Sequence, residues 1–212
     1  MKKIVVLISG EGQTLQSIID ACKAGDIPAQ ICAVIANKAN AYGLQRAKMA
    51  EIPTALFERK DYADNLAMDR AIGDYIAELG ADLIVLAGYM KILTAEFTQR
   101  FAGKILNIHP SLLPKYPGLH TYQRALEAGE QEHGTTVHFV NEEVDGGAIV
   151  LQAKVPIFPD DEVSDIEQRV KYQEQQIYPL VIKWFVTDRL TLQNGSAYLD
   201  GKCLPNAGYA MD

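Results

Sequence analysis

Five short apolar runs alternate with amphipathic segments through the first half of the chain, and no other sequence feature limits the fold so strongly. The strands predicted from these runs are Lys3–Ser9, Ile31–Ala36, Thr54–Phe57, Leu83–Ala87 and Ile105–Ile108. Helices are predicted between them at 15–22, 41–51 and 62–79, where apolar residues recur at helical spacing. The run at 83–87 is apolar throughout, as in strands covered on both faces. This alternation predicts an α/β fold with a doubly wound, mostly parallel sheet.

A proline-rich loop separates these elements from a second half with a different pattern. Three prolines fall within residues 110–118, so this segment is neither a regular helix nor a central strand. The elements predicted after it are a helix at 122–128, strands at Thr135–Val140 and Ile149–Ile157, and a long helix from a capping box at Ser164–Glu167 to Trp184. The turns Asn194-Gly195 and Asp200-Gly201 then predict small hairpins. We expect an antiparallel C-terminal extension.

The charge and composition of the chain exclude several classes of protein. Its net charge is −7, from 20 basic and 27 acidic residues, and no block of Lys and Arg suits nucleic acid. The apolar run after Met1 is too short for a signal peptide, and no stretch reaches the roughly 18 apolar residues of a membrane span. Cys22, Cys32 and Cys203 have no metal or redox spacing. We therefore expect a cytoplasmic protein without nucleic-acid or membrane partners.

A glycine-rich turn, Ser9-Gly10-Glu11-Gly12-Gln13-Thr14, follows the first predicted strand. At such a turn, backbone N–H groups and the positive end of a helix can bind a phosphate. The turn is not a dinucleotide fingerprint, because Leu15 replaces the third glycine and Asn37-Lys38 stands where an acidic residue would hold a ribose. The pattern favours a phosphate monoester, and a tight turn without a ligand is the alternative.

Asn107 and His109 fall at the end of the fifth predicted strand, where open α/β sheets bind ligands. Strand alternation places both side chains on one face of the sheet, with Ile108 on the other. An amide donor and an imidazole in this position could polarise a carbonyl group and move a proton. The alternative is a pair of hydrogen-bonded polar groups beneath the loop. The rigid loop that follows favours the catalytic interpretation.

Asp145 precedes two glycines and an apolar strand. Asp-Gly-Gly is common turn chemistry, and spacing alone favours that interpretation. A functional Asp145 would instead pair with His109, orient its ring and favour the protonated form. His120, His133 and His138 complete the histidines, and no His-x-x-x-His or Cys-x-x-Cys spacing indicates a metal site. We therefore expect no metal.

The segment Gly88–Leu93 follows the fourth predicted strand and reaches the same edge of the sheet. It offers backbone groups and apolar walls that would suit a flat ring system. The alternative is a plain connection between a strand and a helix.

Long and specific motifs give the chain a resemblance to the folate-dependent phosphoribosylglycinamide formyltransferases of purine biosynthesis. The motifs are Asn107–Gly118, His133–Val140 with Asp145–Gly147, and Leu86–Met90. The resemblance covers essentially the whole chain and implies a single formyltransferase-like domain, 1–212, with a phosphate-binding half at 1–110 and a folate-site half at 111–212. It also implies transfer of the formyl group of 10-formyltetrahydrofolate, a co-substrate, to the glycinamide amine of a phosphorylated ribose.

The resemblance also implies roles for individual residues. It assigns catalysis to Asn107, His109 and Asp145, phosphoribosylglycinamide binding to Gly12, Gln13, Thr14 and Glu174, and folate binding to Met90, Lys91, Ile92, Leu93 and Asn107. Three positions depart from the family. The family's turn usually reads Gly-Ser-Asn in place of Gly12-Gln13-Thr14, and Lys91 replaces a common Arg, which keeps the charge but loses the bidentate fork. Asn65 stands where close relatives carry an Arg that touches folate.

Three other functions compete with this one. Methionyl-tRNA formyltransferase shares the Asn-x-His…Asp core but carries a basic C-terminal domain, whereas this chain ends at Asp212 with an acidic balance. Formyltetrahydrofolate hydrolase usually has an extra N-terminal regulatory domain. A non-catalytic phosphate- or folate-binding module is the alternative from a different class. For the main interpretation we expect small-molecule substrates and a monomer or weak homodimer.

Overall fold

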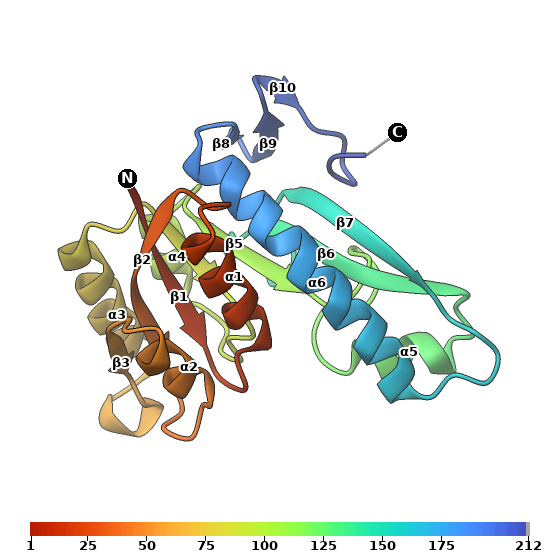
Figure 1. The fold of residues 1–212 in the computed structure, drawn as a ribbon, viewed down its shortest axis with the longest axis horizontal. Helices are drawn as coiled ribbons and strands as arrows, with labels where there is room; N and C mark the ends of the chain where they lie inside the picture. Colours follow the sequence, from red (N-terminus) through yellow and green to blue (C-terminus); the bar gives the residue numbers. More distant parts are fainter. Residues whose placement is uncertain (211–212) are drawn as a thin grey trace. The chain divides into compact units, whose positions relative to one another are not determined.

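The predicted strands of the first half form a parallel sheet in the computed structural model, which describes residues 1–210 (Figure 1). The strands are β1 (Lys2–Ile8), β2 (Ala29–Ala36), β3 (Thr54–Leu56), β4 (Leu83–Leu86) and β5 (Ile105–His109). They lie in the order β3-β2-β1-β4-β5, and the pairs between them are parallel. The chain therefore begins in the middle of the sheet and adds strands first on one side and then on the other.

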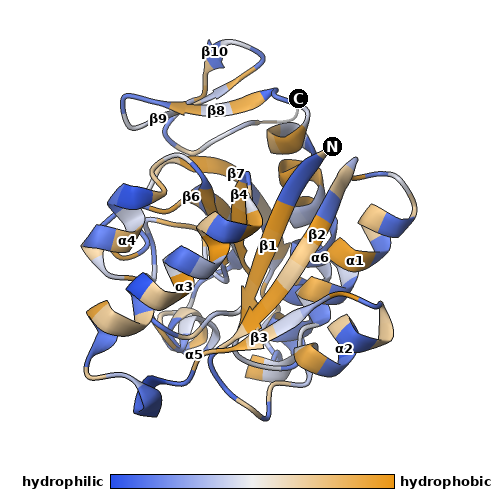
Figure 2. Ribbon diagram, turned by 90° about the vertical axis from the view of Figure 1, so that its left-hand side faces the viewer, coloured by the Kyte–Doolittle hydropathy of each residue, from blue (hydrophilic) through white to orange (hydrophobic). Residues whose placement is uncertain are grey.

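Helices cover both faces of this sheet. They are α1 (Gln13–Lys23), α2 (Gly43–Met49), α3 (Asn65–Leu79) and α4 (Ala95–Arg100), with a short 3₁₀ helix, η1 (Arg59–Asp61). Helices α1 and α2 contact each other on one side of the strands, and α3 and α4 contact each other on the other side (Figure 2). The connections thus change face between β1 and β4, which is the doubly wound arrangement. The predicted fold class is confirmed.

Apolar side chains bury both faces of the central strand β1. Its last five residues, Ile4 to Ile8, are each 0% exposed, and β4 is buried along its whole length. Strands covered on both faces need no polar alternation, and β1 is hydrophobic along most of its length (Figure 2). Each fully buried aliphatic side chain stabilises the fold by roughly 1.5–3 kcal/mol. The β1–β4 pair is therefore the best-anchored part of this sheet.

The described residues form two compact units, and the second begins at Ile108. Its elements are α5 (Thr121–Glu127), β6 (Glu132–Phe139), β7 (Ile149–Pro156), α6 (Val163–Val186), β8 (Leu190–Gln193), β9 (Ser196–Leu199) and β10 (Lys202–Cys203). Strands β6 and β7 are antiparallel and follow β5 in the order of a seven-stranded sheet. Helix α6 packs on both of them through buried residues that include Ile166, Val170 and Tyr178.

The C-terminal extension is a separate antiparallel sheet of β8, β9 and β10, as predicted. Asn194-Gly195 connects β8 to β9, and Asp200-Gly201 connects β9 to β10. All four residues have positive φ, at 51°, 78°, 53° and 80° in chain order. Two consecutive left-handed residues form the type I′ turn, whose twist matches that of the flanking strands.

Several predicted boundaries differ from the structure, among them the start of the helix predicted at 62–79, which begins at Asn65. Two other differences have a clear physical cause. Helix α6 begins at Val163, after a capping box in which the N–H of Glu162 donates to Asp165 at 2.8 Å, so the predicted box at Ser164–Glu167 lies inside the helix. The strand predicted to begin at Thr135 begins at Glu132 instead. Its first residues are polar or glycine, but they pair with the end of β7, and this pairing outweighs their low strand propensity.

Several broad predictions concern the whole chain. The division into units falls between residues 107 and 108, close to the predicted boundary at 110, and the single domain 1–212 stays a prediction. Within residues 1–210, no helix combines the length and the apolar character needed to cross a bilayer. The cytoplasmic location and the monomer or weak homodimer stay predictions.

Truncation of Ile4 to alanine should destabilise the protein, because this side chain is 0% exposed in the centre of the sheet. We expect Ile4→Ala to lower the free energy of unfolding by about 2–5 kcal/mol, measured by urea denaturation. Met49→Ala is the control, since Met49 is 79% exposed in α2 and its loss should change stability little. Equal effects of the two substitutions would contradict this account of the core.

Candidate active site

The change of face between β1 and β4 leaves the carboxyl ends of these two strands without a covering connection, and open α/β sheets bind ligands at such a point. Ser9, directly after β1, joins the segments that meet here. Its hydroxyl donates to Asn37 Oδ1 at 2.6 Å and accepts a hydrogen bond from the Met90 N–H at 2.8 Å. The glycine-rich turn after β1 and the segment after β4 are therefore fixed to each other by one buried hydroxyl.

Three consecutive carbonyl groups of the glycine-rich turn accept hydrogen bonds from helical residues. The pairs are Gly43 N–H to Gly10 O at 3.1 Å, Arg46 Nε to Glu11 O at 2.8 Å, and Gln16 N–H to Gly12 O at 2.9 Å. The first-turn N–H groups of α1, by contrast, have no partner within the helix. With its acceptors occupied, the turn presents donors and the positive end of α1, which suits an anion such as a phosphate.

Two glycines allow this turn to lie against the start of α2. Gly12 has a φ of 80°, which residues with a side chain rarely adopt, and a Cβ atom there would lie 2.8 Å from the Gly43 Cα atom. A Cβ atom on Gly43 would lie 2.3 Å from Ile8 Cδ1. The turn is thus fixed by close backbone packing as well as by hydrogen bonds.

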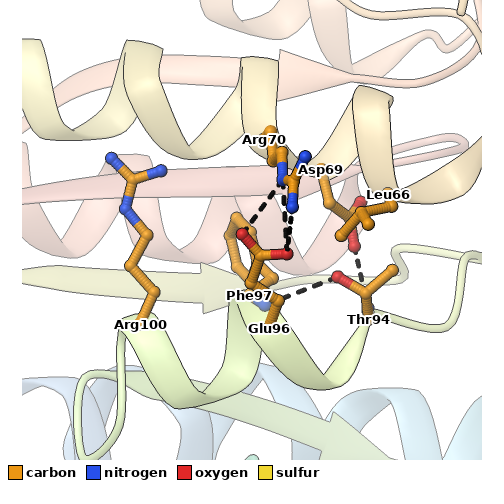
Figure 3. Close-up of a pocket in the computed structure, with 7 residues that line it drawn as sticks. All are labelled: Leu66, Asp69, Arg70, Thr94, Glu96, Phe97 and Arg100. Carbon is orange, nitrogen blue, oxygen red and sulfur yellow. Dashed lines mark hydrogen bonds and ion pairs between the residues drawn. The ribbon is translucent and has the colours of Figure 1, made fainter.

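A buried ion pair shapes the segment after β4. The Lys91 ammonium contacts the Asp69 carboxylate, with side-chain exposures of 9% and 1%, and the other Asp69 oxygen accepts the Thr94 N–H at 2.8 Å (Figure 3). Lys91 therefore fixes the segment after β4 to α3, and its charge is neutralised by Asp69. The exposed side chains on either side of Lys91 are apolar, since Met90 is 60% exposed and Ile92 is 70% exposed.

Asn65 begins α3, the helix that also carries Asp69. Its Oδ1 accepts a hydrogen bond from Arg59 Nε at 3.1 Å, so a guanidinium lies beside this position although residue 65 is not arginine. A small hollow between α3 and α4 is lined by Leu66, Asp69, Arg70, Thr94, Glu96, Phe97 and Arg100 (Figure 3). Arg70 and Glu96 form an ion pair across this hollow, with 3.0 Å between Arg70 Nε and Glu96 Oε1. Each charge therefore already has a partner of the opposite sign.

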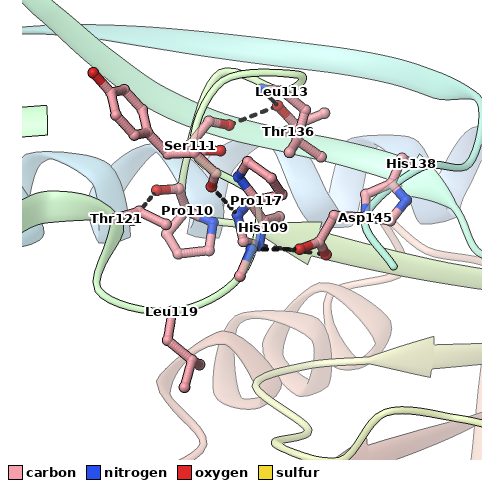
Figure 4. A network of polar contacts seen from close by, with 12 residues as sticks. His109, Pro110, Ser111, Leu113, Pro117, Leu119, Thr121, Thr136, His138 and Asp145 are labelled. Carbon is pink, nitrogen blue, oxygen red and sulfur yellow. Dashed lines mark hydrogen bonds and ion pairs between the residues drawn. The ribbon is translucent and has the colours of Figure 1, made fainter. Parts of the chain in front are cut away.

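In the second unit, the His109 ring faces one oxygen acceptor at each nitrogen. Nε2 lies 2.9 Å from the main-chain oxygen of Tyr116, and Nδ1 lies 3.6 Å from Asp145 Oδ1 (Figure 4). Because a carbonyl oxygen can only accept, Nε2 must carry the hydrogen of that bond. The second distance is too long for a direct hydrogen bond but leaves the carboxylate close enough to stabilise positive charge on the ring.

The proline-rich loop holds Asp145 in place. The Gly118 N–H donates to Asp145 Oδ2 at 2.8 Å, and the carboxylate side chain is only 12% exposed. Asp145 itself has a φ of 54°, and a Cβ atom on Gly147 would lie 1.7 Å from the Phe139 oxygen. The turn interpretation and the functional interpretation of Asp145 are therefore compatible, because the turn aims the carboxylate at His109.

Glu174 of α6 reaches this region through a threonine hydroxyl. The Thr135 Oγ1 atom lies 3.0 Å from the His109 main-chain oxygen and 3.4 Å from Glu174 Oε1. Burial raises the pKa of the Glu174 carboxyl to about 7, although the Thr135 hydrogen bond and Lys171 act in the opposite direction. A neutral Glu174 can donate to Thr135 while Thr135 donates to His109, which satisfies all three oxygens.

Two other buried histidines lie near this pair. Burial lowers the pKa of both His133 and His138, so their rings are neutral at physiological pH. His138 Nδ1 bonds the main-chain oxygen of Phe139 at 2.8 Å. In residues 1–210, no three His, Cys, Asp or Glu side chains are grouped so that they could hold a metal ion.

Comparisons of the sequence and of the fold with known proteins point to one family. The family described as formyl transferase matches residues 2–182. The chain belongs to the formyl transferase family. The phosphoribosylglycinamide formyltransferase of Haemophilus influenzae is 72% identical over the full length of both chains, and that of Escherichia coli is 53% identical over 99% of each. The phosphoribosylglycinamide formyltransferase structure from Coxiella burnetii superposes with a TM-score of 0.95 at 44% identity, covering 100% of this chain and 99% of that one.

The predicted site residues of this formyl transferase fall into two groups. In the first unit, Gly12 caps α1 and Gln13 and Thr14 begin it, Met90 to Leu93 follow β4, and Asn107 lies in the middle of β5 opposite Leu86, the last residue of β4. In the second unit, the structure brings together His109, Asp145 and Glu174. The resemblance to phosphoribosylglycinamide formyltransferases is confirmed, and the roles of the individual residues stay predictions.

Four residues that contact the candidate site were not predicted to do so. Thr135 lies inside a quoted motif, and only its contacts distinguish it from its neighbours. Ser9 carries a weak signal, since it is a polar residue directly after a buried strand. Arg46 and Tyr116 act on or through main-chain oxygens, and a main-chain contact leaves no residue-type signature.

The raised pKa of Glu174 predicts a pH dependence of stability. Because its pKa is about 7, Glu174 keeps its proton in the folded protein up to about pH 7, whereas the unfolded chain releases it near the ordinary glutamate pKa of 4.5. Between these values, rising pH should therefore lower the free energy of unfolding of the wild type relative to Glu174→Gln, by about 3 kcal/mol in total. Urea denaturation at about pH 4.5 and about pH 8 measures this difference.

Glu167→Gln on the same helix is the matched control for Glu174, because Glu167 is 38% exposed in a surface pair with Lys171. A surface pair contributes little to stability, so this variant should follow the wild type at both pH values. If Glu174→Gln and Glu167→Gln respond alike to pH, Glu174 is not the buried neutral acid described above.

Proposed function

We propose that this formyl transferase moves the formyl group of 10-formyltetrahydrofolate to the amine of 5-phosphoribosylglycinamide, a step of purine biosynthesis. The observation that carries the proposal is the His109–Asp145 pair, 3.6 Å apart, in a chain that aligns over its full length with phosphoribosylglycinamide formyltransferases. The phosphate-type turn at α1 and the exposed apolar segment after β4 supply the two kinds of surface that these substrates require.

The reaction needs an environment that favours a tetrahedral intermediate. The glycinamide amine attacks the formyl carbon, a C–N bond forms, and the carbonyl oxygen becomes negatively charged. When this intermediate collapses, the bond from the formyl carbon to the folate nitrogen breaks. Direct attack needs no covalent bond to the enzyme, provided that both substrates are held side by side.

In this proposal Asn107 and His109 donate hydrogen bonds to the negatively charged oxygen. His109 Nε2 is bonded to the Tyr116 oxygen, so Nδ1 is the nitrogen that serves the reacting oxygen. Asp145, 3.6 Å from Nδ1, stabilises the positive ring that makes this donation strong. The attacking amine loses one proton and the departing folate nitrogen gains one, and in this proposal Asp145 relays that proton through water.

The glycine-rich turn holds the phosphate of the ribonucleotide in this proposal. Gly12, Gln13 and Thr14 offer backbone donors at the start of α1. Those donors do not depend on side-chain identity, which explains how Gln13 and Thr14 can stand where relatives have Ser and Asn. Arg46 holds the Glu11 oxygen away from the site and adds a positive charge nearby.

One assay separates this function from its competitors. The protein is incubated with 10-formyltetrahydrofolate alone, with 5-phosphoribosylglycinamide or with charged initiator tRNA, and release of tetrahydrofolate is followed. Release that requires the ribonucleotide supports the proposal. Release without it indicates a hydrolase, transfer to charged initiator tRNA indicates a methionyl-tRNA formyltransferase, and binding without turnover indicates a binding module.

Loss of either member of the His109–Asp145 pair should reduce turnover strongly. We expect His109→Ala and Asp145→Asn each to lower kcat by about 10²–10³-fold, because an oxyanion donor or the charge that supports it is lost. Steady-state kinetics with both substrates measures the effect, and circular dichroism checks the fold.

Glu142→Gln is the control for Asp145→Asn, because Glu142 is an exposed acid in the same loop. It removes one negative charge near Asp145 without touching His109, so kcat should stay near that of the wild type. Near-wild-type turnover of a folded Asp145→Asn variant would rule out the proposed role of Asp145.

Replacement of Arg46 should weaken binding of the phosphorylated substrate selectively. Arg46→Met removes the donor that holds the Glu11 oxygen at 2.8 Å, so this carbonyl is free to turn towards the phosphate. We expect the KM for 5-phosphoribosylglycinamide to rise about tenfold, the loss of one charge-assisted hydrogen bond, while the KM for 10-formyltetrahydrofolate stays unchanged. Lys48→Met, an exposed cation of the same helix, is the control and should leave both KM values unchanged.

A further inference from the structure

The His109 ring is held by a main-chain oxygen rather than by the carboxylate beside it. Nε2 donates to the Tyr116 oxygen at 2.9 Å, a normal hydrogen-bond length. Asp145 is farther from the ring, at 3.6 Å. Which nitrogen faces the reacting oxygen, and which carries the hydrogen, therefore depends on where the Tyr116 carbonyl points.

That carbonyl belongs to a residue in an unfavourable backbone conformation. Tyr116 has a φ of 53°, in the left-handed region that residues with a side chain seldom adopt. Such a conformation persists only where the surroundings hold it, and it is concentrated at functional sites. The structure must therefore contain contacts that keep Tyr116 in place.

The Tyr116 side chain provides these contacts. Its hydroxyl donates to Glu130 Oε1 at 2.9 Å, and this hydrogen bond is the largest of the effects that lower the pKa of Glu130, so the acceptor is a carboxylate at neutral pH. The Arg124 guanidinium lies 5.3 Å from the centre of the ring, and the centre of the His133 ring lies 6.1 Å from it in an edge-on arrangement. Three sides of the ring are occupied.

Arg124 also fixes the main chain that follows. It donates to the Pro117 oxygen at 2.7 Å and to the Leu119 oxygen at 3.1 Å. Next along the loop, the Gly118 N–H donates to Asp145. The same stretch of loop therefore sets the acceptor for His109 and the donor for Asp145, and Tyr116 anchors it at its start.

We propose that Tyr116 is a positioning residue for His109, whose side chain, held by Glu130 and Arg124, fixes the carbonyl that accepts the Nε2 hydrogen. The effect on catalysis rests on the proposed formyl transfer, whereas the effect on the ring does not. Tyr116 does not touch the reacting atoms in this proposal. It acts by leaving Nδ1 as the one nitrogen that faces Asp145 and the substrate.

The ring of His109 can be observed directly by NMR of protein labelled with ¹⁵N in its histidines. The chain has four histidines, and the signals of His109 are those lost in His109→Asn. At a pH high enough to deprotonate the ring, we expect the wild type to keep its hydrogen on Nε2, bonded to the Tyr116 oxygen. In Tyr116→Phe, which keeps the aromatic ring and removes only the hydroxyl, the signals should move towards those of a ring that exchanges its hydrogen between both nitrogens.

Kinetics of the same variants tests the consequence for turnover. We expect Tyr116→Phe to lower kcat about tenfold, as for other residues that orient a catalytic side chain, and to leave both KM values near those of the wild type. Glu130→Leu should behave like Tyr116→Phe, whereas Glu130→Gln, which keeps an acceptor oxygen, should retain most of the turnover. Lys115→Met is the matched control, because it removes the other partner of Glu130 and leaves the tyrosine hydroxyl bonded.

The NMR and kinetic measurements distinguish a failure of this proposal from a failure of the proposed function. Unchanged His109 signals in both Tyr116→Phe and Glu130→Leu overturn the proposal, and so does a defect confined to KM, which a simple loop anchor would produce. A wild-type protein without ribonucleotide-dependent turnover overturns the proposed function, while the NMR comparison still decides whether Tyr116 holds the ring.

Discussion

The burial of two parallel strands, β1 and β4, determines where polar loops can lie in the first unit. The connections that follow these strands leave on opposite faces of the sheet. Strand β4 and the last five residues of β1 are buried on both faces, and all of their side chains are apolar. Polar groups first become possible where these strands end, and there the diverging connections leave the ends uncovered. Ser9 occupies that position and joins the turn after β1 to the segment after β4. Because the strands are buried, the candidate ligand-binding loops of the first unit lie at the ends of the strands.

Much of the precision of these loops comes from main-chain atoms. In the glycine-rich turn, three consecutive carbonyl oxygens are held by helical donors, which leaves N–H groups for an anion. In the second unit, a carbonyl of the proline-rich loop holds His109 and an N–H of the same loop holds Asp145. Main-chain groups are rigid once the loop is rigid, so they position side chains with little conformational freedom left to lose. Prolines and packed aromatic rings make the second loop rigid enough for this purpose.

The sequence was informative wherever a local rule determines structure. Apolar periodicity located the strands and helices, and Asn194-Gly195 and Asp200-Gly201 located the hairpins, because two positive φ values in a row suit few other residue pairs. The capping box of α6 was misplaced because Glu162 and Ser164 are both acceptable first residues, and only the hydrogen bond to Asp165 distinguishes them. The His109–Asp145 contact joins residues 36 positions apart, and it came from the family resemblance since no local pattern encodes it. The role of the Tyr116 carbonyl could not be predicted from the sequence, because every residue has a main-chain carbonyl group.

The close packing of Gly12 on Gly43 restricts how this sequence can change over time. A methyl group on either glycine would collide, with the partner's Cα atom in one case and with Ile8 in the other. A side chain on Gly12 would force the turn and the start of α2 apart, and that movement would break the Gly43–Gly10 hydrogen bond as well, whereas a side chain on Gly43 would displace the Ile8 side chain from the core. Either change would disturb the turn that we propose as the phosphate site. The two positions, 31 residues apart, should thus behave as one inherited unit, so that descendants of this chain vary freely around the pair but not within it.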